Sequence, residues 1–193
     1  KQLVYTRTIQ NPIAGGKLTG KIGGLSVGYL GAIDETFSVG REDVYVNLLR
    51  ARADLGTSST IGAVYTDRTS NSTDFNRVLG ADARIQIGGR YTFTAMGARS
   101  FTNDAVLRDR QDGTMGSLRF ERAGRTFQLN AEFEDTQQSF KPGSGFFQRI
   151  GTAQANSRLS YTWFGQRGAF FESIGPSLEV KAFWDHERFW RGE

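Results

Sequence analysis

Three glutamates on either side of a short connection are the residues with the clearest potential for chemistry. Glu132 and Glu134 are two residues apart, and Glu121 precedes the connection. Because residues two apart share one face of a strand, the three carboxyl groups could meet as the acid and base of a glycosidase. Arg119 and Arg125 are near enough to pair with them, and a ladder of paired charges is far commoner. The pattern favours a charged strand surface, and we expect no enzymatic activity.

Two other places have side chains of the types that bind ions. The segment 67–74 has the acids and hydroxyls of a calcium loop without the spacing of an EF-hand, so we expect a solvated loop. His186 lies between Asp185 and Glu187 and is the one histidine of a chain that has no cysteine. A single imidazole without a partner is more often a loop residue than a metal ligand. We therefore expect no catalytic residue, no metal site and no cofactor.

The glutamates belong to a predicted β-hairpin. From Phe127 to Phe133, apolar residues alternate strictly with polar ones, which is the period of a strand with one apolar and one polar face. Leu118 and Phe120 share the apolar face of the preceding strand, and the three residues 123–125 are short enough for a turn.

The same alternation repeats along the chain and predicts about ten strands in five hairpins. Turns inside hairpins are short, as at Gly23-Gly24, Gly88-Gly89 and the residues 165–168. Connections between hairpins are longer and polar, and we expect them at 67–76, 102–112 and 135–149. Short turns at one end and long loops at the other are typical of outer-membrane barrels.

The composition of the 193 residues agrees with an all-β protein. Glycine accounts for 24 residues and phenylalanine for 15, whereas proline accounts for only 3. The formal net charge of +4 is small and the basic residues are interspersed with acids, so nucleic-acid binding is not expected. The sequence has no apolar run of about 20 residues, which excludes a membrane-spanning helix but not membrane-spanning strands.

The polar faces of the predicted strands are strongly charged. The opposite faces mix small and large apolar residues, which suits a lipid-facing surface better than the packed core of a sandwich. Tyrosines and tryptophans near strand ends are typical of interfacial girdles; they are Tyr29, Tyr65, Tyr91, Tyr161, Trp163 and Trp184. The charged residues expected to line a lumen are Lys17, Lys21, Arg50, Arg52, Asp54, Asp82, Arg84, Arg119, Glu121, Glu132, Glu134, Arg158, Glu179 and Lys181.

Four stretches carry a resemblance to a known family. They are Tyr5-Thr6-Arg7, PIAGGKLTGKIGGLSVGYL (12–30), FNRVLGADARI (75–85) and PGSGFFQR (142–149). Together they resemble the outer-membrane β-barrel of unknown function that follows a carbohydrate-binding-family-9-like module in Gram-negative bacteria. The resemblance implies location and architecture, and no catalytic residue of that family can be carried over. This sequence departs from the family pattern in two ways: the upstream sugar-binding-like module is absent, and the sequence stops at Glu193, short of a terminal aromatic strand signature.

We thus expect an all-β fold, an antiparallel up-and-down transmembrane β-barrel in which this chain supplies about ten strands, either as the whole barrel or as part of a larger one. A lead-in segment would span 1–15 and the barrel 16–193. The expected partners are outer-membrane lipid and a small solute or glycan, and the expected role is solute passage or surface binding at the Gram-negative outer membrane. The alternatives are a soluble β-sandwich that binds glycans through exposed aromatic residues and, less favoured, an enzyme on an all-β scaffold.

Overall fold

The computed structural model describes residues 9, 11–35, 43–104, 109–145, 147 and 149–192. The predicted all-β antiparallel architecture is confirmed, with about ten strands in a single large sheet. Successive strands pair as neighbours along the whole sheet, in the order β1-β2-β3-β4-β5-β6-β7-β8-β9-β12. The described lengths are 9 to 14 residues for these ten strands.

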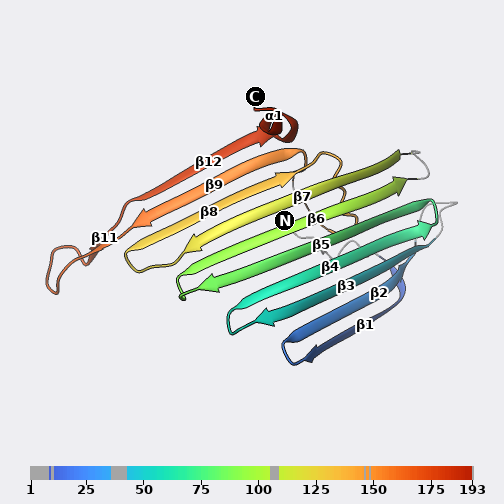
Figure 1. Ribbon diagram of the computed structural model, residues 1–193, viewed down its shortest axis with the longest axis horizontal. Helices are drawn as coiled ribbons and strands as arrows, with labels where there is room; N and C mark the ends of the chain where they lie inside the picture. Colours follow the sequence, from blue (N-terminus) through green and yellow to red (C-terminus); the bar gives the residue numbers. More distant parts are fainter. Residues whose placement is uncertain are drawn as a thin grey trace.

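The ten strands of the large sheet lie side by side in chain order (Figure 1). A two-stranded sheet and a short helix follow β9 and β12. The strands are β1 (Pro12–Ile22), β2 (Leu25–Asp34), β3 (Val44–Leu55), β4 (Ser59–Asn71), β5 (Asp74–Ile87), β6 (Tyr91–Asp104), β7 (Asp109–Arg122), β8 (Phe127–Thr136), β9 (Thr152–Tyr161), β10 (Trp163–Phe164), β11 (Ser173–Ile174) and β12 (Ser177–Asp185), and the helix is α1 (His186–Arg191).

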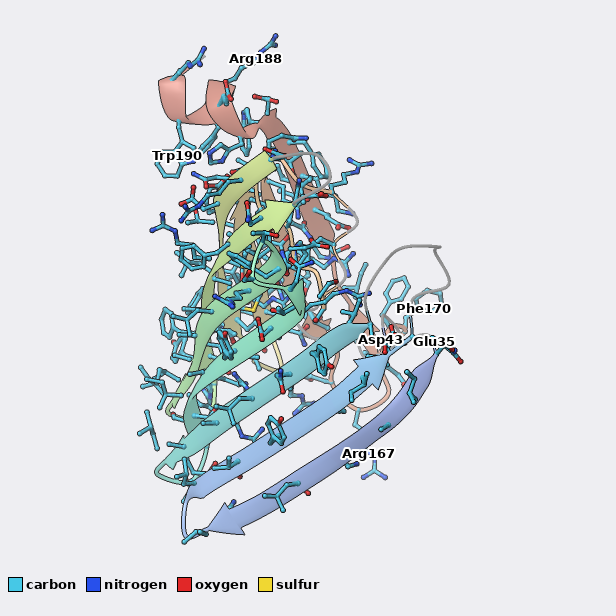
Figure 2. The ribbon with its side chains drawn as sticks, turned by 90° about the vertical axis from the view of Figure 1, so that its right-hand side faces the viewer. Glu35, Asp43, Arg167, Phe170, Arg188 and Trp190 are labelled. Carbon is cyan, nitrogen blue, oxygen red and sulfur yellow. The ribbon has the colours of Figure 1, made fainter. Side chains whose placement is uncertain are left out.

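The large sheet is open. In the described residues β1 pairs only with β2, and β12 pairs only with β9. Strands β1 and β12 therefore form the opposite edges of the sheet (Figure 1). Figure 2, viewed from the side, shows that the sheet is curved and carries side chains on both surfaces. The strand pairing of a closed ten-stranded barrel is therefore not present among the described residues.

Glycines shape the short turns at one end of the sheet, which we call the hairpin end. Gly23 has φ 56°, and Gly88 and Gly89 have φ 58° and 66°. These left-handed values are strained for residues with a Cβ atom and ordinary for glycine. The turns predicted at Gly23-Gly24 and Gly88-Gly89 are therefore confirmed.

At the opposite end, called the far end, two predicted loops are wrong. The polar stretch 67–76 is strand on both sides of a turn at residues 72–73, because β4 continues to Asn71 and β5 begins at Asp74. The stretch 102–112 is likewise mostly strand, since β6 ends at Asp104 and β7 begins at Asp109. Long antiparallel pairing satisfies the backbone polar groups of these polar residues, which side-chain polarity alone does not reveal.

Connection lengths do not follow the predicted asymmetry. The last hairpin does not turn at 165–168; its connection runs from 162 to 176 and contains the β10–β11 pair. At the far end, the long connection expected at 135–149 occupies 137–151. The first strand begins at Pro12, earlier than the alternation from Gly16 suggests. Residues 1–8, 10, 36–42 and 105–108 lie outside the described residues, as do Phe146 and Gln148 of the stretch 142–149.

Helix α1 ends the described chain. The Asp185 carboxylate caps its first turn by accepting hydrogen bonds from the backbone nitrogens of Glu187 and Arg188, and Gly192 ends it with φ 76°. No helix in the described part of the chain is long and apolar enough to cross a membrane.

Candidate functional site: the charged face of the sheet

All fourteen residues predicted to line a lumen lie on one face of the sheet, here called the charged face. The strand register shows this directly, because residues paired across antiparallel strands point to the same side. One row runs from Arg52 to Asp82 and on to Glu134 through their paired neighbours. The other eleven lie an even number of residues from this row on their own strands.

Ion pairs connect neighbouring strands across the charged face. Arg119 Nη2 lies 2.8 Å from Glu132 Oε1 between β7 and β8, and Arg158 Nη2 lies 2.6 Å from Glu179 Oε2 between β9 and β12. Lys181 Nζ also reaches Glu179, at 2.7 Å. Such exposed pairs are screened by solvent and contribute little to stability. Their main consequence is that they neutralise some charged side chains of this face and leave others without an ion-pair partner.

One pair spans a strand that lies between its partners. Arg50 on β3 binds Asp82 on β5 with both terminal guanidinium nitrogens, and the Nη2–Oδ1 distance is 2.8 Å. It crosses β4 at Gly62, where a Cβ atom would come within 2.7 Å of the guanidinium. Glycine is therefore what makes room for the crossing. Lys21 and Asp54, on β1 and β3, are linked in a similar way at 2.8 Å.

The two halves of the charged face differ in charge. Of the fourteen residues, strands β1 to β5 carry Lys17, Lys21, Arg50, Arg52 and Arg84 against two aspartates. Within the described residues, Lys17, Arg52 and Arg84 form no ion pair within 4.0 Å. Strands β7 to β12 carry four glutamates against three basic residues. One half is thus basic and the other slightly acidic, so the face is not the evenly mixed surface that the sequence suggests.

The charged face is hollowed in two places near the hairpin end. A cavity of about 440 Å³ is bordered by Arg84, Thr92, Glu121, Asn130 and Arg158, and a second, of about 390 Å³, lies beside Arg50 and Arg52. Guanidinium and hydroxyl groups border both, and side-chain amides and the Glu121 carboxylate border the first, so hydrogen-bonding groups stand beside apolar surface in each. These hollows can hold a small polar solute.

The candidate catalytic glutamates have ordinary partners. Glu132 is paired with Arg119, and Glu121 accepts a hydrogen bond of 3.2 Å from the side-chain amide of Asn130. Gln154 donates to Glu134. Arg125, expected in the same ladder, instead places its guanidinium over the ring of Phe164. This is the charge ladder that the sequence favoured, with Arg125 as the exception.

His186 is the first residue of α1 and not a loop residue. Its Nδ1 atom lies 2.6 Å from Asp135 Oδ1, and Trp190 Nε1 donates to Asp135 Oδ2 at 2.9 Å. Phe189 packs against Phe133, with ring centroids 5.4 Å apart. Among the described residues, no group of three potential ligands could hold a metal ion. The histidine therefore anchors α1 to the end of β8.

The opposite side of the sheet, called the apolar face, is largely uncovered. Ile22 is 84% exposed, Leu18 73% and Leu118 61%. Paired rows connect these residues with Tyr29, Leu49, Ile61 and Leu79 on the same face. Exposed apolar side chains of this number, continuous across ten strands, are far more than a soluble monomer usually carries.

Aromatic rings gather at the two ends of this face. At the hairpin end, Phe93 and Phe120 lie 4.8 Å apart and Tyr161 lies 4.8 Å from Trp163. Towards the far end, Tyr29 lies over Gly31 and its hydroxyl donates to Asn47 at 2.8 Å. The tyrosines and the tryptophan among them combine an apolar ring with one polar group, which suits the edge of an apolar band.

The position of one element is not predicted by the sequence: the segment 137–145 folds back over the charged face on β4 to β7. Phe140 has 0% of its surface exposed and packs among Val64, Val78, Ala98 and Met115. The signal was present, because a phenylalanine stands in a polar connection while Val64 and Val78 stand at charged-face positions. Phe140 is far from Val64 and Val78 in the sequence, so the sequence does not show that they are in contact.

No protein-family model, no curated protein and no solved structure matches the chain.

Proposed function

We propose that this sheet is the wall of a transmembrane β-barrel, with the apolar face against lipid and the charged face lining a polar lumen for a small polar solute. The observation that carries the proposal is the difference in solvent exposure between the two faces of the sheet. The apolar face is exposed, whereas the charged face is partly covered by the chain's own segment 137–145. A sheet in water places these faces the other way round, and a sheet in lipid places them as they are here.

The slant of the apolar band supports tilted strands. Towards the far end, the first polar residue of the apolar face is Asp67 in β4, Arg99 in β6 and Asp135 in β8, so the border moves two residues for every two strands. Four residues, or about 13 Å, over four strand spacings, or about 19 Å, correspond to a slope of about 35°. Strands of closed barrels tilt by about 35–45°.

The hairpin turns are staggered by the same amount. The turn after Ile22 is level with Ala83 in β5, yet β5 continues to Ile87 before it turns. This is again four residues over four strands. The chain's turns and its apolar band therefore follow one slanted plane, as they do where a tilted sheet crosses a membrane.

The width of the band fits a hydrocarbon layer. In β5 it extends from Leu79 to Ile87, which is about 27 Å along the strand and about 22 Å along the axis of a barrel tilted by about 35°. The outward apolar band of outer-membrane barrels is about 25 Å tall. The aromatic residues at its two borders correspond to interfacial girdles.

The solute is inferred from the charged face. The cavities beside Arg84 and Arg52 offer guanidinium, amide and hydroxyl groups, which suit a polar or anionic solute. The family resemblance favours a carbohydrate and the outer membrane of a Gram-negative bacterium. The free edges of β1 and β12 would pair with each other or with further strands to close the barrel.

Membrane fractionation tests this proposal. We expect the protein to sediment with membranes, to need detergent for extraction, and to migrate differently on gels with and without heating, because a closed barrel resists the detergent until it is heated. A protein that is monodisperse in buffer without detergent would contradict the proposal. Such a protein that also bound polysaccharide would support the glycan-binding sandwich instead.

Replacement of Asp82 by asparagine should shift the charge preference of the lumen towards anions. Without Asp82, Arg50 loses its counter-ion and joins Lys17, Arg52 and Arg84 as an uncompensated base. Reversal potentials in planar bilayers under a salt gradient measure the shift. Asp67→Asn is the matched control, because Asp67 pairs with Arg77 at 3.0 Å on the other face of the sheet. Equal shifts in both variants would exclude a lumen on the charged face.

A further inference from the structure

The segment 137–145 lies against the charged face over strands β5 to β7. The hydroxyl of Ser139 donates to the backbone oxygen of Asp112 at 2.7 Å, and the backbone nitrogen of Lys141 donates to Ser100 Oγ at 3.0 Å. Ser100 and Gly113 are paired residues of the charged-face rows. The segment therefore sits on the side proposed to be the lumen.

Asn76 of β5 holds the backbone of the segment on both sides. Its side-chain nitrogen donates to the backbone oxygen of Lys141 at 2.7 Å, and its side-chain oxygen accepts from the backbone nitrogen of Gly143 at 2.8 Å. The same nitrogen also donates to Thr102 Oγ1 at 2.7 Å. An amide that uses donor and acceptor together fixes the backbone in position as well as in direction.

The wall beneath the segment is shaped for it. Val64, Val78, Ala98 and Met115 form an apolar patch on the charged face, and Phe140 packs on this patch and is itself completely buried. The ring of Phe147 meets that of Phe140 edge to face at 5.3 Å. Burial of this apolar patch removes it from water, and the hydrophobic effect therefore stabilises the segment in its position against the sheet.

Glycine permits the closest approach. A Cβ atom on Gly113 of β7 would overlap the backbone of Ser139 and Phe140, and a Cβ atom on Gly143 would come within 2.7 Å of Asn76 Cγ. By contrast, Gly116, three residues along β7, has nothing within 4 Å of such an atom. The wall and the segment thus meet backbone against backbone.

From these contacts we infer that the segment 137–145 is a fixed constriction, which covers the far-end part of the charged face on β4 to β7 and confines a solute to the charged rows beside Arg50, Arg84 and Arg119. The inference rests on the proposed barrel and adds to it the element that sets the size limit. The segment is bound by buried apolar contacts and backbone hydrogen bonds, so it acts as a static part of the wall. A movable lid would instead be held by few contacts.

Gly113→Val tests the constriction, with Gly116→Val as its control. In liposome-swelling assays with a monosaccharide, a disaccharide and a tetrasaccharide, we expect Gly113→Val to lose the size discrimination of the native protein and Gly116→Val to keep it. Asn76→Ala serves as a second variant, since it removes three hydrogen bonds without a steric clash and should also admit the larger sugars. Unchanged size discrimination in both Gly113→Val and Asn76→Ala would overturn the constriction while leaving the barrel in place.

A cross-link tests the position of the segment independently of passage. A Cβ atom on residue 143 would lie 3.0 Å from Asn76 Cβ, which is shorter than the roughly 3.5–4.5 Å between the Cβ atoms of disulfides, so a small outward shift of the segment accommodates the bond. In this cysteine-free chain, Asn76→Cys with Gly143→Cys should form a disulfide. The reduced variant lacks the Asn76 hydrogen bonds and should admit larger sugars, as Asn76→Ala does, and oxidation should restore the native size limit. No cross-link, or a smaller size limit after oxidation, would overturn a fixed constriction. If no variant and no native protein passes any sugar, the proposed passage function falls as well.

Discussion

Replacement of Leu118 by arginine should prevent stable insertion into a membrane. Leu118 is 61% exposed in the middle of the apolar face, between Ala95 and Phe133 in the paired row. If this face meets lipid, a charge there costs about 2–4 kcal/mol, the value for arginine at the bilayer midplane of a barrel. Folding from urea into lipid vesicles, followed by the heat-dependent shift on gels, measures the loss.

The adjacent residue provides the control for this substitution. Ser117 lies on the charged face and pairs with Glu134 in the strand register, so Ser117→Arg adds the same charge one residue away and gains an acidic neighbour. We expect its insertion to be close to that of the native chain. If Ser117→Arg impairs insertion and Leu118→Arg does not, the two faces are assigned the wrong way round.

Replacement of Phe140 by alanine should lower the free energy of unfolding by about 3–5 kcal/mol, the usual cost of truncating a buried phenylalanine. Phe140 is completely buried between the segment 137–145 and the wall, and its removal leaves a cavity over Val78 and Met115. Urea unfolding in detergent micelles, followed by tryptophan fluorescence, measures the change.

The control for this prediction is Phe170, in the connection between β9 and β12. It is 94% exposed, so Phe170→Ala should leave the unfolding midpoint unchanged. Equal midpoints for the native chain and Phe140→Ala would mean that the segment does not stabilise the folded protein. A constriction fixed by the packing of Phe140 would then be excluded as well.

Much of the sheet could be predicted because its information is local. Alternation with a period of two assigns each residue to a face, and a glycine pair with positive φ marks a turn, so the hairpins at Gly23-Gly24 and Gly88-Gly89 and the fourteen charged-face residues followed from the sequence. The polar stretch 67–76 was mistaken for a loop because its side chains carry no apolar period. Its strands are stabilised by backbone pairing with their neighbours, which composition does not report.

The sequence by itself determined that this chain is all-β, that its strands have one charged and one apolar face, and which residues share each face. Only the tertiary structure decided which charges pair across strands, as Arg50 does with Asp82 over Gly62, and that the apolar face stays uncovered while Phe140 buries a patch on the other. The reason is the range of the interactions. Side-chain alternation is set between neighbouring residues, whereas the contact of Phe140 with Val78 joins residues more than sixty positions apart.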